Sequence, residues 1–197
     1  MSSKTDILNR IRSHKLPAAA HPEMDADWIR FEDPESQFVD VVTSVGGQVA
    51  APVDASQLRE ALLRLSCLAD AKKIVCNVSE AGLGNCNLSD VSDPHELADV
   101  DVAIIAGEFA VAENGAIWVP DRGIKHRAIL FLTQHLVLVV PRSAIDHNLH
   151  QAYERLRFDQ AGYGVFISGP SKTADIEQSL VIGAHGPRSL TVILVTR

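Results

Sequence analysis

The residue types best suited to chemistry lie close together near the C-terminus, in the stretch 164–187. An apolar run at 165–167 is typical of a buried parallel strand, and four turn-forming residues follow it at 168–171. Apolar residues then recur at helical spacing over 173–182, and Gly183 follows where a helix would end. Because α/β sheets bind ligands in the loops after strand C-termini, the loop 168–171 is the first candidate for function.

This loop and the start of the predicted helix form a candidate anion site. Backbone amides and hydroxyls at a helix N-terminus readily hold a carboxylate or a nucleotide phosphate. Asp175 and Glu177 already satisfy the dipole of the predicted helix and repel a second negative charge, whereas Lys172 offsets one of their charges. An anion site and a self-capped helix therefore remain equally open. The ligand-binding residues expected in this region are Ser168, Gly169, Ser171, Lys172, Thr173, Glu177 and Gly186.

His185 follows the predicted helix, where the negative end of the helix dipole favours a protonated imidazole. One interpretation makes it a cap within a tight turn, in which Gly183 or Gly186 adopts a positive φ. The other makes it a general base for a substrate hydroxyl, or a hydrogen-bond donor to a substrate carboxylate. We favour the cap, unless the fold brings Glu113, Asp175 and His185 together as catalytic residues.

The composition predicts one ordinary α/β domain in a reducing compartment. The chain has 197 residues, of which 46% are hydrophobic and 22% charged, and its formal charge is −7. This acidic balance disfavours nucleic acid and anionic membrane surfaces as partners. Cys67, Cys76 and Cys86 include no C-x-x-C pair, which argues against a disulfide framework and against an iron–sulfur cluster held by this chain alone.

The two ends of the chain are predicted to differ in organisation. Residues 1–35 are expected to form an N-terminal arm with a short helix at 5–15, and residues 36–197 the α/β domain. No apolar run approaches the ~20 residues needed to span a bilayer, and the first residues lack the apolar segment of a signal peptide. We therefore expect a cytoplasmic protein.

The order of the predicted elements gives the fold class. Asp33-Pro34 is a typical helix start, and further helices are predicted from Ser56 and from Ser143. Asn114-Gly115 between apolar flanks predicts a β-hairpin. The alternation of helices and strands predicts a single three-layer α/β domain with a mostly parallel sheet. The predicted strands are 48–53, 73–78, 101–106, 130–132, 136–140, 165–167 and 191–195.

Two glycines in the polar loop 79–95 resemble part of a phosphate-binding loop. Gly82 and Gly84 follow a predicted strand, but Asn87 stands where the third glycine of that motif would be. No lysine follows in the P-loop pattern either. We therefore interpret both glycines as turn residues.

Three residues of types that can bind a metal share one face of the helix predicted from Ser143. His147, His150 and Glu154 have a spacing compatible with a metal ion. Their face lies opposite the apolar stripe of the same predicted helix. We assign them to a solvated or interface surface and expect no metal site.

The C-terminal motif resembles that of a known family. The segment S-G-P-S-K-T-A-D-I-E from Ser168, followed by G-x-H-G-P around His185, is similar to the signature of the lactate-utilisation protein C family, or LUD domain. Lys172 stands where family members often carry arginine, and the resemblance runs from about Val39 to the C-terminus. It implies the fold of the sugar-phosphate isomerases and coenzyme A transferases. It also implies oxidation of L-lactate to pyruvate beside partner proteins that carry iron–sulfur clusters, with no cofactor in this chain.

Glu113-Asn114-Gly115 resembles the element that supplies the reactive glutamate of the coenzyme A transferases. This resemblance implies that Glu113 acts as a nucleophile or general base, with Asn114 and Gly115 beside the ligand. The alternative is a carboxylate hydrogen-bonded to its own hairpin. Lactate-utilisation relatives often show A-E-T-G-S here, whereas Asn114 and Ala116 lack the two hydroxyls, so this chain cannot supply them to a mechanism that needs them.

Three functions are compatible with these observations. The first is a lactate-utilisation subunit that works with iron–sulfur partners and binds a small carboxylate or nucleotide. The second is a transferase that uses Glu113, and the third is a non-catalytic scaffold of an oxidoreductase complex. The sequence shows no dinucleotide fingerprint or flavin motif. The first function is therefore our working hypothesis, with the redox groups expected on the partners.

Overall fold

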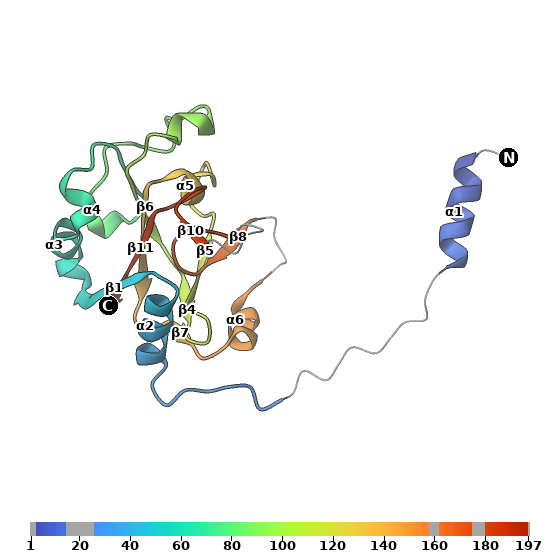
Figure 1. Ribbon diagram of the computed structural model, residues 1–197, viewed down its shortest axis with the longest axis horizontal. Helices are drawn as coiled ribbons and strands as arrows, with labels where there is room; N and C mark the ends of the chain where they lie inside the picture. The colour runs from blue at the N-terminus through green and yellow to red at the C-terminus, as the bar shows by residue number, and fades with distance from the viewer. Residues whose placement is uncertain (1–2, 15–25, 158–161, 175–179, 197) are drawn as a thin grey trace.

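A parallel sheet forms the centre of the domain in the computed structural model, which describes residues 3–14, 26–157, 162–174 and 180–196. Within these residues five strands pair in the order β1-β11-β6-β3-β2, and every pairing is parallel (Figure 1). The predicted mostly parallel sheet is therefore confirmed. Its strands are β1 (Gln48–Asp54), β2 (Ile74–Cys76), β3 (Val102–Ala106), β6 (His135–Pro141) and β11 (Ser189–Thr196).

A smaller mixed sheet packs beside the central one. Its order is β7-β4-β5-β8, with antiparallel β4–β5 and β5–β8 pairs and a parallel β4–β7 pair. The predicted hairpin is confirmed as the β4–β5 pair, and residues 112–115 connect the two strands. The strands are β4 (Phe109–Val111), β5 (Ala116–Pro120), β7 (Ile145–Asp146) and β8 (Gly164–Ile167).

The C-terminal motif folds differently from its prediction. β8 pairs antiparallel with β5 and does not join the parallel sheet, so the expected parallel strand at 165–167 is wrong. The helix predicted over 173–182 is also wrong, because β9 (Lys172–Ala174) and β10 (Leu180–Ile182) form an antiparallel pair. Beyond β9 and β10, Gly183 N–H donates to the Ser171 carbonyl, which extends this pairing. β-Branched residues such as Thr173 and Val181 suit strands as well as buried helix faces.

Several helices agree only in part with their predictions. α2 (Pro34–Ser44) begins as expected, and its N-cap Asp33 accepts from two backbone amides of the first turn. The helix predicted from Ser56 is divided into η1 (Ala55–Gln57), α3 (Leu58–Leu63) and α4 (Ser66–Ala69). The expected strand at 130–132 is wrong, because this segment lies in the helix α5 (Ile129–Leu132).

The helix predicted from Ser143 begins later than expected. Residues 145–146 form strand β7, and α6 (Leu149–Arg155) starts after the N-cap Asn148. The Asn148 carboxamide accepts from Gln151 N–H and thus supplies the cap that Ser143 was expected to give. The remaining helices are α1 (Ser3–Ser13), η2 (Ser79–Ala81) and η3 (Pro94–Leu97).

Two apolar clusters bury the opposite faces of the parallel sheet. Alternate strand residues point to opposite sides, so Val192 packs with α2, α5 and the small sheet, whereas Ile193 packs with α3 and α4. The predicted three layers are therefore present, although a second sheet forms much of one outer layer (Figure 1). A separate aromatic cluster joins Phe109, Trp118 and Phe166 within the small sheet.

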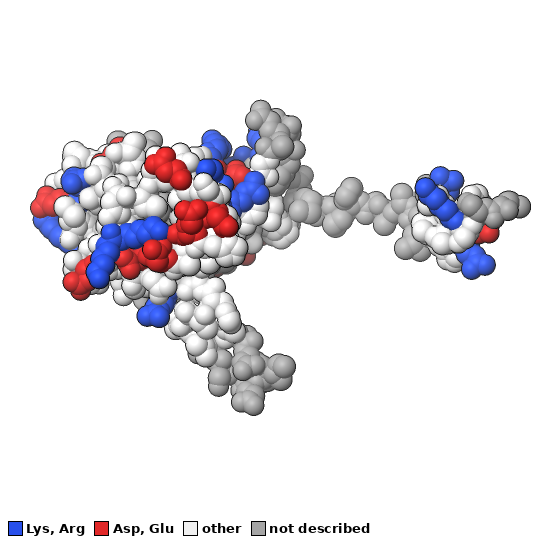
Figure 2. Space-filling model, turned by 90° about the horizontal axis from the view of Figure 1, so that it is seen from above, with Lys and Arg blue, Asp and Glu red and all other residues white. Residues whose placement is uncertain are grey.

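The N-terminal helix α1 exposes all of its residues. Ile7 and Ile11 are 55% and 64% exposed, and Lys and Arg side chains of this helix lie on its surface (Figure 2). On the face of the domain seen in the same figure, Lys and Arg side chains intermingle with Asp and Glu. The proposed division of the chain at residue 35 stays a prediction. Within the described part of the chain, no helix is long and apolar enough to cross a membrane.

Candidate functional site

The loop 168–171 meets the tip of the hairpin, as the candidate site requires. Ser168 Oγ donates to the Asn114 carbonyl oxygen at 2.8 Å. Gly169 has φ +75°, and a Cβ there would lie 2.8 Å from the Val45 carbonyl oxygen at the end of α2. Gly115 has φ +64° and approaches α2 from the hairpin side. The loop, the hairpin tip and α2 therefore form one closely packed junction that favours glycine at both positions.

The turn that holds His185 forms the second side of the site. Ser171 N–H donates to the Pro187 carbonyl at 2.9 Å, and the Ser171 carbonyl accepts from Gly183 N–H at 2.9 Å. A Cβ on Gly186 would lie 2.9 Å from the Ser171 Cβ, so the two segments touch. Gly183 adopts the positive φ that a turn cap requires, whereas Gly186 does not. His185 is exposed beside this junction.

A cavity of about 230 Å³ lies between these two segments. Most of its wall is apolar, and its polar side chains come from Ser168, Ser171 and His185. This combination suits a small molecule with one hydrocarbon end and one polar end. Its lining comprises Leu130, Phe131, Leu136, Val165, Phe166, Ile167, Ser168, Gly169, Pro170, Ser171, His185, Gly186, Pro187 and Leu190.

Two other predicted ligand-binding residues, Lys172 and Thr173, belong to β9 and do not line this cavity. The predicted catalytic residue Asp175 and the predicted ligand-binding residue Glu177 fall outside the described residues. The predicted helix N-terminus after residue 171 is wrong, because residues 172–174 form a strand. An anion at the loop would therefore gain nothing from a helix dipole and would bind only to hydroxyls and backbone amides of the loop.

Glu113 faces the helix α6. Its carboxylate accepts from Leu149 N–H at 2.9 Å, in the first turn of that helix, and its own N–H donates to the His147 carbonyl. Asn114 in the same turn uses its side-chain oxygen to accept from Ala116 N–H. Neither Glu113 nor Asn114 lines the 230 Å³ cavity. These contacts favour a structural role for Glu113, and its proposed action as a nucleophile stays a prediction.

Glu113→Ala is expected to lower the free energy of unfolding by about 1 kcal/mol, because Leu149 N–H loses its acceptor. Glu113→Gln keeps an acceptor oxygen and should lose less. Urea unfolding of both variants measures the difference. Mass spectrometry after incubation with an acyl-CoA and hydroxylamine tests the other role, and modification at Glu113 would contradict the structural interpretation.

The histidines once considered for a metal bind the segment before α2. His147 lies outside α6, and its Nδ1 accepts from Phe31 N–H at 3.0 Å. His150 stacks on Trp28 with 3.4 Å between the ring centroids. Among the residues that the structure describes, no group of three His, Cys, Asp or Glu side chains could hold a metal ion. Both histidines therefore contact the segment before α2, and the assignment of the face of His147, His150 and Glu154 to a solvated or interface surface stays a prediction.

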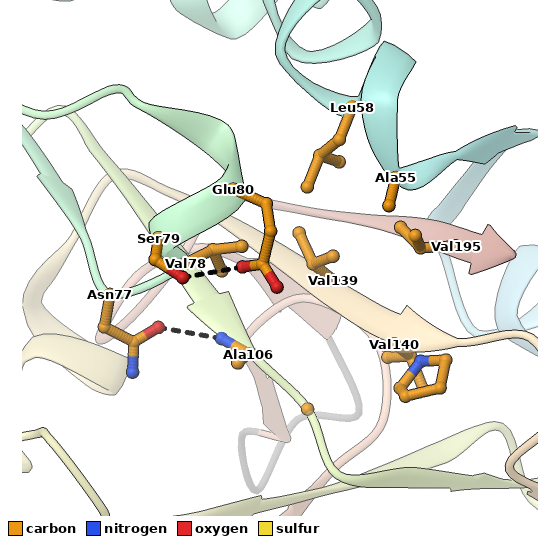
Figure 3. A pocket seen from close by; sticks show the side chains of 12 residues that line it. Ala55, Leu58, Asn77, Val78, Ser79, Glu80, Ala106, Val139, Val140 and Val195 are labelled. Carbon is orange, nitrogen blue, oxygen red and sulfur yellow. Dashed lines mark hydrogen bonds between the residues drawn. The ribbon is translucent and has the colours of Figure 1, made fainter. Parts of the chain in front are cut away.

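A second cavity, which sequence reasoning missed, lies at the carboxyl ends of β2, β3, β6 and β11. It measures about 240 Å³, and its polar lining comes from Asn77, Ser79 and Glu80 (Figure 3). Asn77 Oδ1 accepts from Ala106 N–H at 2.9 Å, and Ser79 Oγ donates to Glu80. Open α/β sheets commonly bind ligands at this edge. The available signal was a run of polar residues directly after β2, and the Glu80 carboxylate disfavours an anionic ligand.

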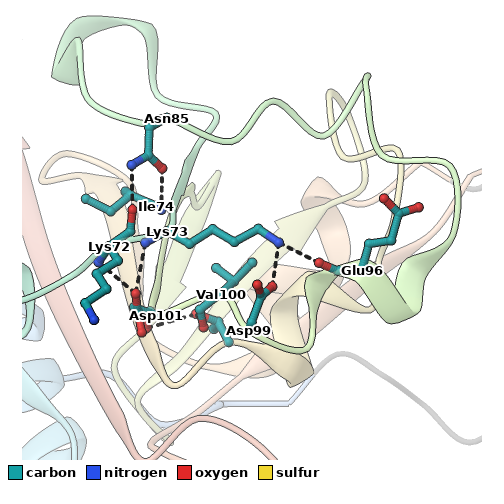
Figure 4. Close-up of polar contacts among 9 residues, drawn as sticks. Lys72, Lys73, Ile74, Asn85, Glu96, Asp99, Val100 and Asp101 are labelled. Atoms are coloured by element: carbon teal, nitrogen blue, oxygen red, sulfur yellow. Dashed lines mark hydrogen bonds and ion pairs between the residues drawn. The ribbon is translucent and has the colours of Figure 1, made fainter.

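The loop that carries Ser79 and Glu80 is fastened to the edge of the parallel sheet (Figure 4). The Asn85 carboxamide accepts from Ile74 N–H at 2.8 Å and donates to the Lys72 carbonyl at 2.6 Å. Lys73 Nζ reaches the Glu96 carbonyl and the Asp99 carboxylate near the far end of the loop. Gly82 and Gly84 both have positive φ, which agrees with their interpretation as turn residues. These contacts fix the loop against the edge strand β2.

The stability of the sheet edge at β2 is expected to depend on pH through the Asp101 carboxyl. Hydrogen bonds from the amides of Lys73 and Lys72 lower the pKa of its carboxyl below the ordinary value. Its contribution to stability is therefore complete above about pH 4 and is lost as pH falls through the lowered pKa. Asp101→Asn should lower stability at neutral pH by about 1 kcal/mol and flatten the loss below pH 4. Thermal unfolding across this pH range measures both effects, and parallel curves for the two proteins would contradict the prediction.

The three cysteines are free thiols, and each is half-buried. Burial raises the pKa of the Cys67 and Cys76 thiols, so both stay protonated near neutral pH. Cys76 packs on the α3 side of the sheet and Cys86 on the other side. The two thiols therefore face different layers, although Cys86 forms a bridge with Val75, the neighbour of Cys76 in β2.

The fold defines an α/β domain built on a mostly parallel sheet, and the comparisons with known proteins agree with it. The crystal structure of a DUF162 family protein from Deinococcus radiodurans superposes with a TM-score of 0.67. The match covers 82% of this chain and 96% of that protein at 21% sequence identity. At this level of identity the likeness concerns the fold alone.

Sequence comparison gives the family. The model of the LUD domain matches residues 88–195, and the chain belongs to the LUD domain family. It is 33% identical to Lactate utilization protein C of Geobacillus thermodenitrificans over 162 residues, covering 77% of this chain and 63% of the relative. It is 31% identical to Lactate utilization protein C of Shouchella clausii over 163 residues, covering 73% and 71%. The resemblance seen in the C-terminal motif is thereby confirmed.

Proposed function

We propose that the chain is a lactate-utilisation subunit that acts in the cytoplasm with iron–sulfur partner proteins to oxidise L-lactate to pyruvate. The observation that carries this proposal is its similarity to two proteins named Lactate utilization protein C. Oxidation of the lactate hydroxyl to a ketone releases two electrons and two protons. The electrons pass to the clusters of the partner proteins, and this chain contributes to binding the substrate.

The cavity between the loop 168–171 and His185 supports the binding of a small carboxylate. Its apolar wall, which includes Leu136 and Leu190, suits the methyl group of lactate. Ser171 Oγ and the His185 ring make no hydrogen bond with the described residues, so both can bind a carboxylate or hydroxyl. The volume of about 230 Å³ favours a ligand of this size over a nucleotide.

Reconstitution with the partner proteins tests this function. We expect lactate-dependent reduction of an electron acceptor to fall at least about tenfold when this chain is left out. The double variant Ser171→Ala/His185→Ala should raise KM for L-lactate, whereas Ser44→Ala/His95→Ala, at exposed positions outside the cavity, should not. Full activity of the partners in the absence of this chain would refute the proposal.

A further inference from the structure

A third cavity, of about 290 Å³, lies beside α4 at the amino ends of three neighbouring strands. It is on the α3–α4 face of the sheet, because its lining strands point their apolar residues, such as Val137 and Ile193, into that layer. This face separates it from the 230 Å³ cavity, and its place at the amino ends of the strands separates it from the 240 Å³ cavity at their carboxyl ends. Its lining residues are Gln48, Leu65, Ser66, Cys67, His135, Ser189 and Thr191.

The strand residues on this face change from apolar to polar at one level of the sheet. On this side of β11, Val195 and Ile193 are apolar, whereas Thr191 and Ser189, nearer the amino end of the strand, are polar. The register aligns Ser189 with His135 of β6 and Thr191 with Gln48 of β1. Three adjacent strands therefore present polar side chains together under α4.

Thr191 distinguishes this cavity from an ordinary polar sheet edge. The residue is only 6% exposed, and its hydroxyl makes no hydrogen bond within the described structure. The other buried threonine, Thr133, donates to the His135 carbonyl at 3.1 Å. Among the described residues, the buried side-chain atom without a hydrogen-bond partner is Asp146 Oδ2, so the Thr191 hydroxyl is not sealed in the core and opens into the cavity. An unpartnered hydroxyl that opens into a cavity is available to a ligand.

The lining is rich in hydrogen-bond donors. His135 Nδ1 and Ser189 Oγ lie 2.8 Å apart, which fixes the imidazole ring against the strand. Hydroxyl, thiol, amide and imidazole groups can all donate here, and no carboxylate is among the lining residues. The nearby Asp101 carboxylate is occupied by the backbone amides of Lys72 and Lys73. This lining therefore favours a ligand whose oxygens accept several hydrogen bonds, in contrast to the cavity that contains Glu80.

We propose that this cavity binds a small oxyanion, a carboxylate or phosphate, which accepts from the Thr191 hydroxyl and from the His135–Ser189 pair. The site goes beyond the proposed function and does not depend on it. The volume of about 290 Å³ limits the ligand to a small metabolite or an inorganic anion.

Calorimetric titration with inorganic phosphate and, separately, with L-lactate tests the site. We expect at least one of them to bind, with an affinity that Thr191→Val lowers about tenfold or more. Thr196→Val is the matched control, because Thr196 is an exposed threonine of the same strand outside this cavity. Phosphate binding alone identifies a phosphate-type ligand, and lactate binding alone a carboxylate. Absence of binding at millimolar concentrations, or equal affinity of Thr191→Val and the wild type, overturns the proposal.

Two further readouts separate this site from loss of folding and from the His185 cavity. Thr191→Val keeps the side-chain shape and removes an unpartnered hydroxyl, so its melting temperature without ligand should equal or exceed that of the wild type. A clearly lower melting temperature would mean that the hydroxyl has a protein partner and would contradict the proposal. His185→Ala should leave the Thr191-dependent binding unchanged, even if it abolishes lactate oxidation, and loss of that binding would also count against a separate site.

Discussion

Gly164→Ala is expected to lower the free energy of unfolding by about 3 kcal/mol. A Cβ at this position would lie 2.1 Å from Cζ2 and 2.4 Å from Cη2 of Trp118, which is far inside contact distance. The indole cannot move away easily, because it packs between Phe109 and Phe166, with ring centroids 6.4 Å and 4.8 Å away. The added methyl group must therefore push β8 away from β5. Because β8 leads directly into the loop 168–171, the loop would be displaced as well.

Urea unfolding of Gly164→Ala beside Gly162→Ala measures this effect. The control position is two residues away, and the nearest atom to its added Cβ is an Asp121 carboxylate oxygen at 4.0 Å. Both variants remove the same glycine freedom from the unfolded chain, so their difference reports the clash with Trp118. Equal unfolding midpoints for the two variants would show that β8 and β5 are not packed as described.

Arg155→Met is expected to cost about 2 kcal/mol, because it leaves a buried carboxylate without its partner. Asp146 is 7% exposed, and its Oδ1 accepts from Nε and Nη2 of Arg155 at 3.0 Å and 2.7 Å. Its Oδ2 has no hydrogen-bond partner among the described residues. Arg155 therefore supplies most of the interaction that offsets the cost of burying this carboxylate. The Arg155 side chain is itself 45% exposed, which keeps the expected cost below that of a fully buried pair.

A double-mutant cycle separates the ion pair from the packing of Arg155 over Phe109. Asp146→Asn/Arg155→Met should recover part of the stability lost in Arg155→Met, because no unpaired charge remains buried. Arg64→Met is a useful control, since Arg64 and Glu60 form an exposed pair that is worth less than about 0.5 kcal/mol. Thermal unfolding at neutral pH gives each value. Strictly additive effects of the two substitutions would mean that the pair contributes nothing.

Local signals predicted much of the fold. The Asp33-Pro34 start of α2 and the hairpin at Asn114-Gly115 depend on caps and turns within a few residues. The long apolar runs of β6 and β11 marked them as buried parallel strands for a similar reason. In such segments the local pattern and the tertiary structure favour the same conformation.

The errors fall where tertiary contacts decide between helix and strand. Residues 173–182 carry a helical pattern, but Ser171 pairs with the turn at Gly183 and Pro187, and the strands β9 and β10 follow from this pairing. The short apolar segment around Leu130 had no local feature to separate a buried helix from a strand. Both alternatives bury the same apolar side chains, so the sequence pattern alone could not choose.

The candidate site was predicted in part. The contact between Ser168 and Asn114 is present, whereas the Glu113 carboxylate faces α6. The direction of a side chain at a hairpin tip depends on which neighbouring element offers it a donor, and here Leu149 N–H does so. The cavity around Thr191 was missed because an isolated threonine in an apolar strand gives no signal until its hydrogen-bond partners are known.

A titration of ¹⁵N-labelled protein with L-lactate, followed by amide chemical shifts, tests the proposed substrate site most directly. We predict saturable shifts of Gly169, Ser171 and Gly186, whose backbones surround the 230 Å³ cavity. In the same titration, the double variant Ser171→Ala/His185→Ala should reach half-saturation at a clearly higher lactate concentration. Shifts confined to Asn77 and Ser79, which line the cavity at the carboxyl ends of the parallel strands, would contradict lactate binding at the loop 168–171. The absence of any shift would contradict it as well.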